Sequence, residues 1–148
     1  MADTPNIERI ELTLFDVKIE NMSADPSGFG ISYTPGQSRI QTRLAIRIYG
    51  DTGVVGEYVP GRGRARVIQS ASAALGQMLI GKPALQREKN YTTLRRLTKH
   101  VGEVGIGGLD IALWDLAGKH YGAPVFELLG GYRKKLPAYA STIHGDRT

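Results

Sequence analysis

Apolar and polar residues alternate in two segments near the start of the chain, Ile10–Leu14 and Leu44–Ile48. A period of two is typical of a β-strand that buries one face and exposes the other. The second segment is followed by Gly50–Gly53, a Gly-Asp-Thr-Gly sequence typical of a hairpin turn, and then by Val54–Val59 as a returning strand. The pattern therefore predicts a three-stranded antiparallel meander.

The stretch between the first two predicted strands, Ser23–Ser38, is rich in proline and glycine, with apolar residues between them. This composition predicts a loop, because glycine and proline interrupt regular structure. A long loop inside a compact domain is usually functional or disordered. We treat this one as a candidate binding segment; the alternative is a surface loop whose apolar residues pack on their own domain.

Three segments with helical spacing of apolar residues follow the predicted strands. They cover Val67–Leu79, about Gln86–Val101 and Leu109–His120, and the glycine cluster Gly102–Gly108 separates the last two. Strands followed by helices, each kind grouped along the chain, are typical of the α+β class. The predicted fold class is therefore α+β, a meander followed by a helical bundle.

The third predicted helix, around Trp114, is apolar almost all round, which predicts that it is buried between two layers. Asp115 and Lys119 lie one helical turn apart on its polar strip, a spacing that favours an ion pair. Gly122 can adopt the left-handed conformation that ends a helix, and Pro124 suits the first position of a further short helix.

The run from Gly108 to Gly131, GLDIALWDLAGKHYGAPVFELLGG, resembles the end of the N-terminal domain of the mandelate racemase and muconate lactonizing enzymes, a branch of the enolase superfamily. In that family the run precedes a short basic turn and the first strand of a (β/α)8 barrel. Arg133–Lys135 and Leu136–Thr142 occupy the corresponding positions here. The resemblance implies an N-terminal capping domain over residues 1–132, then a linker and the first strand of a truncated barrel over residues 133–148.

The resemblance also implies a chemistry. Enzymes of this family remove the proton next to a substrate carboxylate with a lysine or histidine base, and Mg2+ stabilises the enediolate that forms. They act as racemases, cycloisomerases, epimerases or acid-sugar dehydratases. The base and the metal ligands stand on later barrel strands, and a barrel of about 250 residues does not fit after Leu136. We therefore expect no catalytic residue and no Mg2+ ligand in this chain, and no activity from it alone.

In the resembled family, the loop after the first strand folds over the barrel mouth and contacts the distal end of a small carboxylate substrate. By position, the resemblance implies pocket walls from Phe29, Ile31 and Tyr33. It implies hydrogen-bond partners from Ser32 and Thr34. These five residues are the expected substrate contacts of the cap.

Two further segments are weaker candidates for substrate contact. Ser141 and His144 stand at or just past the end of the implied barrel strand, where such folds place their sites. Gly61–Arg64 opens the first predicted helix, where amide groups and arginines could hold a carboxylate. The alternatives are a frayed tail around His144 and a plain helix-leading loop with solvated arginines.

The composition narrows the class of protein. The chain has 41% hydrophobic residues, no cysteine and a net charge of +5. It shows neither an apolar leader nor a run long enough to cross a membrane, which favours a cytoplasmic protein. The basic residues are scattered and match no nucleic-acid motif, so nucleic-acid binding is the least favoured interpretation.

Two interpretations of the whole chain stay open. In the first, it is the substrate-capping part of a homo-oligomeric enzyme whose own barrel domain lies outside the sequence shown. In the second, it is a standalone, non-catalytic module that binds a protein partner or an anionic ligand. The apolar helix around Trp114 and the strand implied after it predict that the isolated chain self-associates through Leu109–Tyr139.

Overall fold

The computed structural model describes residues 3–24, 30–61, 63–99 and 102–139. The chain divides into two compact units. The first contains Met1–Phe15 and Arg43–Tyr132, and the second contains Asp16–Thr42 and Arg133–Thr148. Both strands of the long N-terminal hairpin therefore pass from the first unit into the second.

A three-stranded sheet forms the base of the first unit. Arg47 and Glu57 lie opposite each other on its second and third strands, which are antiparallel. The turn between these strands is closed by a hydrogen bond from the Gly53 amide to the Gly50 carbonyl, at 2.9 Å. The predicted meander is confirmed. In spatial order the strands are β1 (Ile7–Ala24), β2 (Ile31–Gly50) and β3 (Val55–Tyr58).

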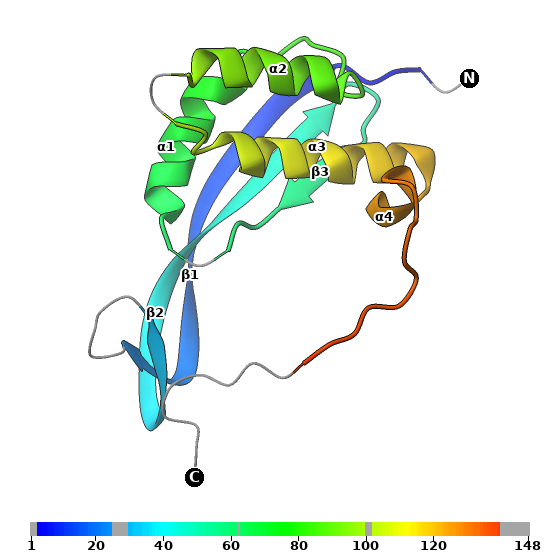
Figure 1. The fold of residues 1–148 in the computed structure, drawn as a ribbon. Coiled ribbons are helices and arrows are strands. Elements are labelled where there is room, and N and C mark those ends of the chain that lie inside the picture. The colour runs from blue at the N-terminus through cyan, green and yellow to red at the C-terminus, as the bar shows by residue number, and fades with distance from the viewer. Residues whose placement is uncertain (1–2, 25–29, 62, 100–101, 140–148) are drawn as a thin grey trace. The chain divides into compact units, whose positions relative to one another are not determined.

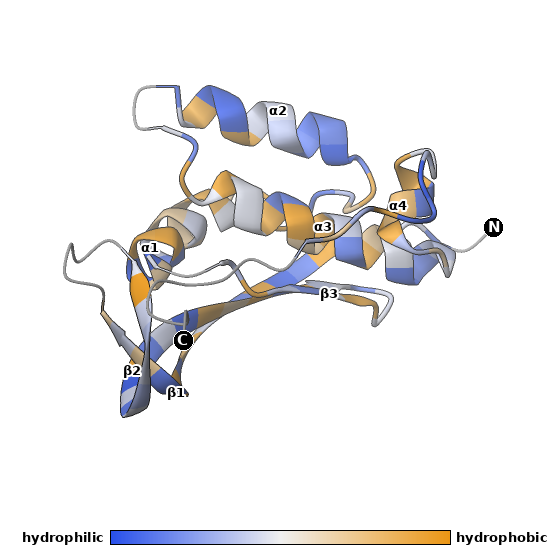
Figure 2. Cartoon of the chain, turned by 60° about the horizontal axis from the view of Figure 1, so that its bottom comes forward, coloured by the Kyte–Doolittle hydropathy of each residue, from blue (hydrophilic) through white to orange (hydrophobic). Residues whose placement is uncertain are grey.

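The described residues form four helices after the sheet: α1 (Ala65–Gly76), α2 (Arg87–Leu97), α3 (Ile106–Tyr121) and α4 (Val125–Leu128). α1 and α3 cover one face of the sheet (Figure 1), and α3 lies between α2 and the strands (Figure 2). The predicted α+β class is confirmed, as is the position of the Trp114 helix between two layers. None of the described helices has the length and apolar character needed to cross a bilayer.

The core of the first unit forms where α3 meets the sheet. Gly56 on β3 permits this close approach, because a Cβ atom there would overlap the Ala112 carbonyl and lie 2.6 Å from Leu116 Cβ. Tight packing of this kind leaves no room for added atoms. The fully buried residues include Leu44, Ile46 and Ile48 from β2 and Leu109, Leu113 and Leu116 from α3.

Glycine ends α3 as the sequence predicts. Gly122 has a φ of 64°, and its amide donates to carbonyls in the last turn of the helix. Pro124 has an extended backbone and stands just before α4 rather than in its first position. α3 is less completely buried than its apolar pattern predicts, because Ile111 is 42% exposed and Tyr121 is 60% exposed.

The second unit overturns the prediction of a loop over Ser23–Ser38. β1 continues to Ala24 and β2 already begins at Ile31, so both ends of this stretch are strand. Neighbouring strands supply each other's backbone partners, and this pairing outweighs the local effect of the prolines and glycines. The prediction counted the interrupting residues and missed the pairing across the hairpin.

Side-chain contacts join the two strands of this hairpin. The hydroxyls of Ser23 and Thr34 lie 2.8 Å apart, and the Gly36 amide donates to Asn21 Oδ1 at 3.0 Å. Asn21 and Gly36 have positive φ angles of 55° and 78°. Asparagine and glycine are the residues that adopt this conformation most readily, so the strands depart from regular geometry at positions suited to it.

The described residues after Tyr132 carry no helix or strand as far as Tyr139. A strand of a parallel barrel forms through hydrogen bonds to neighbouring strands, so its state depends on partners and not on local sequence. The assignment of Leu136–Thr142 as a first barrel strand stays a prediction, and its last three residues lie outside the described part of the chain.

Candidate functional site

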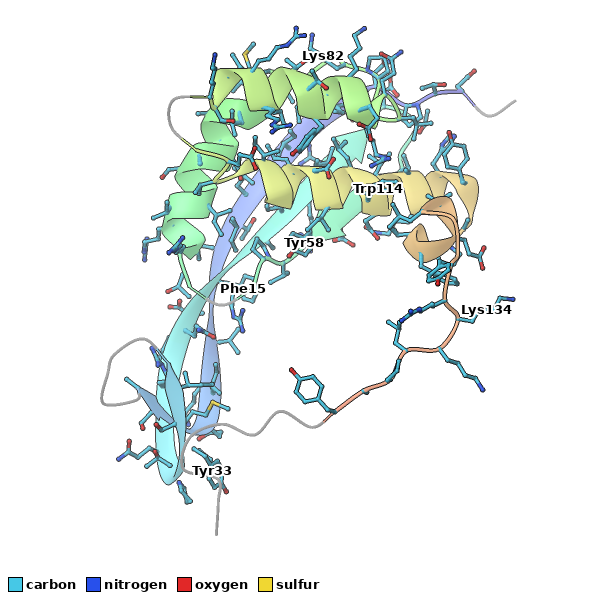
Figure 3. The ribbon with its side chains drawn as sticks, in the orientation of Figure 1. Phe15, Tyr33, Tyr58, Lys82, Trp114 and Lys134 are labelled. Carbon is cyan, nitrogen blue, oxygen red and sulfur yellow. The ribbon has the colours of Figure 1, made fainter. Side chains whose placement is uncertain are left out.

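Four of the predicted substrate contacts lie at the start of β2, in the second unit. Ile31, Ser32, Tyr33 and Thr34 are consecutive strand residues, so their side chains alternate between the two faces of the hairpin. Tyr33 is 39% exposed, whereas Ser32 is only 9% exposed. Figure 3 locates Tyr33 on the hairpin. Tyr33 is therefore the most exposed of these four side chains.

The two hydroxyl candidates differ in what they bond. Thr34 Oγ1 lies 2.8 Å from Ser23 Oγ, so this hydroxyl is already engaged across the hairpin. The Ser32 hydroxyl is buried and has no hydrogen-bond partner among the described residues. A buried hydroxyl without a partner costs free energy. Ser32 is therefore the hydroxyl with unused hydrogen-bonding capacity.

The remaining three predicted contacts, Phe29, Ser141 and His144, lie outside the described residues. The structure thus brings together the Ile31–Thr34 part of the expected site.

The second candidate segment, Gly61–Arg64, leads into α1. Arg64 stands at the start of the helix with a φ of 59°, a strained conformation for a residue other than glycine. A hollow of about 290 Å³ beside it is also lined by Glu103. Glu103 pairs with Arg95 at 3.3 Å and places a negative charge in the lining of this hollow, so the geometry does not favour a carboxylate cradle here. Arg62 lies outside the described residues, and the other walls include Tyr58, Pro60, Ile68 and Ile111.

A charged network, which the sequence predicts only in part, joins β2, β3 and α3. The predicted ion pair between Asp115 and Lys119 is confirmed at 2.7 Å. Lys119 Nζ also lies 3.3 Å from Glu57 Oε2, and Arg47 Nε lies 2.8 Å from Glu57 Oε1. The sequence carries a signal for the Arg47–Glu57 pair, because the turn at Gly50–Gly53 sets these residues opposite each other.

Hydrogen bonds from Arg47 and Lys119 hold the pKa of the Glu57 carboxyl below its usual range. Burial lowers the pKa of Lys119, but its hydrogen bonds to Asp115 and Glu57 outweigh this effect, and its pKa is raised. Both groups are therefore ionised at neutral pH. Such groups hold strands and helix together and are poorly suited to transfer protons.

Two further carboxylates, those of Asp51 and Asp110, lie among groups that hold the fold together. Asp51 accepts hydrogen bonds from Asn6 Nδ2 and from the Asn6 backbone amide, both at 2.9 Å, and these bonds lower the pKa of Asp51. They clamp the N-terminal segment to the β2–β3 turn. Burial raises the pKa of Asp110, and the nearby charge of Arg87 opposes that rise. The Arg87 guanidinium in turn stacks 2.8 Å from the centroid of the Trp114 ring and ties α2 to α3.

The described residues do not fit a Mg2+ site. Nowhere among them do three or more His, Cys, Asp or Glu side chains gather as a metal would require. The carboxylates of Asp115 and Glu57 both pair with Lys119, so neither is free to hold a cation. We derive no reaction step through a metal on this chain.

Comparison with known proteins connects this fold with a family. The chain matches the family model for the mandelate racemase / muconate lactonizing enzyme N-terminal domain over residues 10–130. The chain belongs to this family. It is 38% identical over 110 residues to the D-galactonate dehydratase of Variovorax paradoxus, covering 70% of this chain and 28% of that protein. It is also 38% identical over 110 residues to the D-galactarolactone cycloisomerase of Agrobacterium fabrum, covering 68% of this chain and 28% of that protein.

A solved structure agrees on the fold. The dipeptide epimerase from Enterococcus faecalis, complexed with Mg and the dipeptide L-Leu-L-Tyr, superposes with a TM-score of 0.69 at 20% identity. The match covers 86% of this chain and 35% of that one. At this identity it shows the mandelate racemase / muconate lactonizing enzyme N-terminal fold and no more. The chain spans a little over a quarter of the length of the two curated relatives.

Proposed function

We propose that this chain is the substrate-capping part of an enolase-superfamily enzyme that uses Mg2+ to abstract the α-proton of a carboxylate substrate. The family match over residues 10–130 carries the proposal, because it aligns the chain with the capping domain. Relatives named as a D-galactonate dehydratase and a D-galactarolactone cycloisomerase favour a sugar acid as the substrate. Dehydration and cycloisomerisation are therefore the favoured reactions, ahead of racemisation and epimerisation.

In this proposal residues 1–132 are the cap, and residues 133–148 are the linker and the first strand of a barrel whose remaining part supplies the base and holds Mg2+. The described part of this chain offers no fitting set of Mg2+ ligands. The contribution of the chain itself is to select the substrate and to exclude water from the reacting carbon. The complete enzyme acts as a cytoplasmic homo-oligomer.

The hairpin of the second unit supplies the proposed contact surface. Tyr33 is exposed and combines an apolar ring with a hydroxyl, a combination suited to a sugar acid. Ile31 adds an apolar wall beside it. Ser32 is buried, so its unpaired hydroxyl meets a substrate hydroxyl only after the hairpin rearranges. Thr34 is the weakest of the four, because its hydroxyl is engaged with Ser23. By the family resemblance, the further proposed contacts are Phe29, Ser141 and His144.

A domain graft tests the proposal. Residues 1–132 of this chain replace the corresponding domain of the Variovorax paradoxus dehydratase, and turnover of D-galactonate and D-galactarolactone is measured with Mg2+. We expect turnover well above that of the barrel alone. Tyr33→Ala in the graft should raise KM about tenfold, equivalent to about 1.4 kcal/mol of binding, with a smaller change in kcat. A second graft of Asp16–Thr42 alone guards against misassembly of the larger one.

Leu97→Ala is the control, because this apolar side chain is 49% exposed on α2, in the first unit and outside Leu109–Tyr139, and should leave KM unchanged. The proposal would be contradicted if the folded grafts showed no turnover, or if Tyr33→Ala left their KM unchanged. Either result would favour a standalone binding module. The isolated chain should exchange no α-proton of any hydroxy acid in heavy water. Exchange above background would place a base within this chain.

A further inference from the structure

β3 lies at one edge of the sheet, where backbone groups without a strand partner can accept a strand from another molecule. In antiparallel pairing, the amide and carbonyl groups of alternate residues face the same side of a strand. Val55 and Glu57 are alternate residues of this four-residue strand. The carbonyl of the first and the amide of the second face the free edge, because both bond to α3 and not to β2.

Two side chains of α3 occupy these backbone groups. Lys119 Nζ donates to the Val55 carbonyl at 2.9 Å, and the Glu57 amide donates to Asp115 Oδ2 at 2.8 Å. Hydrogen bonds with one ionised partner are stronger than those between neutral groups. The ammonium takes the place of a neighbouring strand's amide, and the carboxylate takes the place of its carbonyl.

Several contacts hold the two side chains at this edge. Gly56 lets the helix backbone approach β3 closely. The Asp115–Lys119 ion pair at 2.7 Å and the Lys119–Glu57 pair at 3.3 Å link the two side chains to each other and to the strand. Packing and ion pairs at the α3–β3 contact therefore fix both side chains at the edge of β3.

The opposite edge of the sheet is also met by groups of the first unit. The Ile7 amide donates to the Lys82 carbonyl at 2.9 Å, and the Gly81 amide donates to the Ile7 carbonyl at 2.8 Å. Farther along β1, Gln69 Nε2 donates to the Leu12 carbonyl at 3.1 Å. On β1, backbone groups and the Gln69 side chain bond to the outward backbone groups of the strand. On β3, two charged side chains alone do so among the contacts described above.

We propose that Asp115 and Lys119 form an edge lock that prevents β3 from pairing with a second copy of this chain. A second copy fits the opened edge because two β3 strands related by a twofold axis are self-complementary. The Glu57 amide of each copy then faces the Val55 carbonyl of the other. This role concerns association and does not depend on the proposed enzymatic function.

The variant Asp115→Ala/Lys119→Ala opens the lock without changing the net charge. By sedimentation velocity we expect the double variant to self-associate at least tenfold more tightly than the unsubstituted chain. Adding Glu57→Pro removes the outward amide without costing a hydrogen bond to β2, and it should abolish the increase. Asp115→Ala alone frees only the Glu57 amide and should give part of the increase. This single variant tests the proposal if the double variant does not fold.

Two matched variants separate the lock from general effects. Arg95→Ala/Glu103→Ala removes another exposed ion pair, at 3.3 Å between α2 and the loop before α3, and should leave association unchanged. Asp115→Asn/Lys119→Gln keeps an acceptor and a donor at the edge without charge, and it should associate no more tightly than the unsubstituted chain. An opened variant that is folded, shows rapid exchange of the Glu57 amide and associates no more tightly than the unsubstituted chain would overturn the proposal.

Discussion

Substitution by alanine should have opposite effects on stability at two glycines of the first unit, Gly56 and Gly107. A Cβ atom at Gly56 would overlap α3, whereas a Cβ atom at Gly107 would meet nothing within 4 Å. Gly56→Ala should therefore lower the free energy of unfolding by about 3 kcal/mol, at the upper end of the usual cost of overpacking. Gly107→Ala should raise it by about 0.5–1 kcal/mol, because alanine is the better helix former. Urea unfolding of both variants checks this pair, and equal effects would show that α3 does not contact β3 as described.

Asp110 predicts a pH dependence of stability. Burial raises its pKa in the folded state above the unfolded value, so ionisation of the folded protein is unfavourable. The stability that this group contributes is greatest at low pH and is lost as the pH rises from the unfolded pKa through the folded one. Asp110→Asn should therefore stabilise the chain at pH 7 by only a few tenths of a kcal/mol, since solvent screens a partly exposed carboxylate.

The Asp110→Asn difference should shrink to zero once the pH falls below both pKa values. Thermal unfolding of the parent and the variant across the acid range measures it. Asp51→Asn provides the contrast, because hydrogen bonds from Asn6 lower the pKa of Asp51. That substitution should destabilise the chain at neutral pH and lose its effect in acid. A stabilising effect of Asp110→Asn that persists in acid would show that burial of charge is not its cause.

At the scale of elements, the sequence predicts what local information determines. The stripe of Leu109, Leu113 and Leu116 and the glycine at Gly122 place α3 within a few residues, because a helix makes its backbone hydrogen bonds within itself. The prediction of a loop over Ser23–Ser38 was wrong, because a strand's state depends on its partner across the hairpin, as between Ser23 and Thr34. Counting glycines and prolines along the stretch does not reveal that pairing.

In the candidate site, too, the sequence predicts which residues matter but not their surroundings. The resemblance directs attention to Ile31–Thr34, and the structure distinguishes its members: Tyr33 is exposed, Ser32 is buried and Thr34 bonds to Ser23. These differences follow from the register of the hairpin, which a list of residue types does not contain. The spacing of Asp115 and Lys119 predicts their ion pair, but their contact with β3 depends on the packing of α3 against the sheet.

At the scale of the whole molecule, apolar side chains remain exposed in both units. In the first, Tyr121 and Leu129 are 60% and 64% exposed; in the second, Leu136 and Tyr139 are 73% and 88% exposed. Large apolar side chains exposed on a unit can mark an interaction surface of that unit. We therefore expect the isolated chain to self-associate through Leu109–Tyr139, or to bind a barrel domain there.

Replacing Leu136 and Tyr139 with glutamate should weaken this association at least tenfold and leave the meander folded. Sedimentation equilibrium measures the association, and far-UV circular dichroism checks the fold. Glu57→Pro, which acts at the edge of β3, should not weaken it. A monodisperse monomer of the unsubstituted chain at high concentration would contradict the expectation and favour the standalone module.

The continuity of β1 and β2 through both units has a consequence for how such a chain can diversify. Residues added in pairs to both strands of the hairpin keep every side chain on its original face, whereas a single added residue exchanges the two faces. The hairpin can therefore be lengthened or shortened by two residues per strand while the packing of α3 against the sheet within the first unit stays unchanged. The length of the hairpin and the stability of the first unit can then change separately, although the same two strands run through both units.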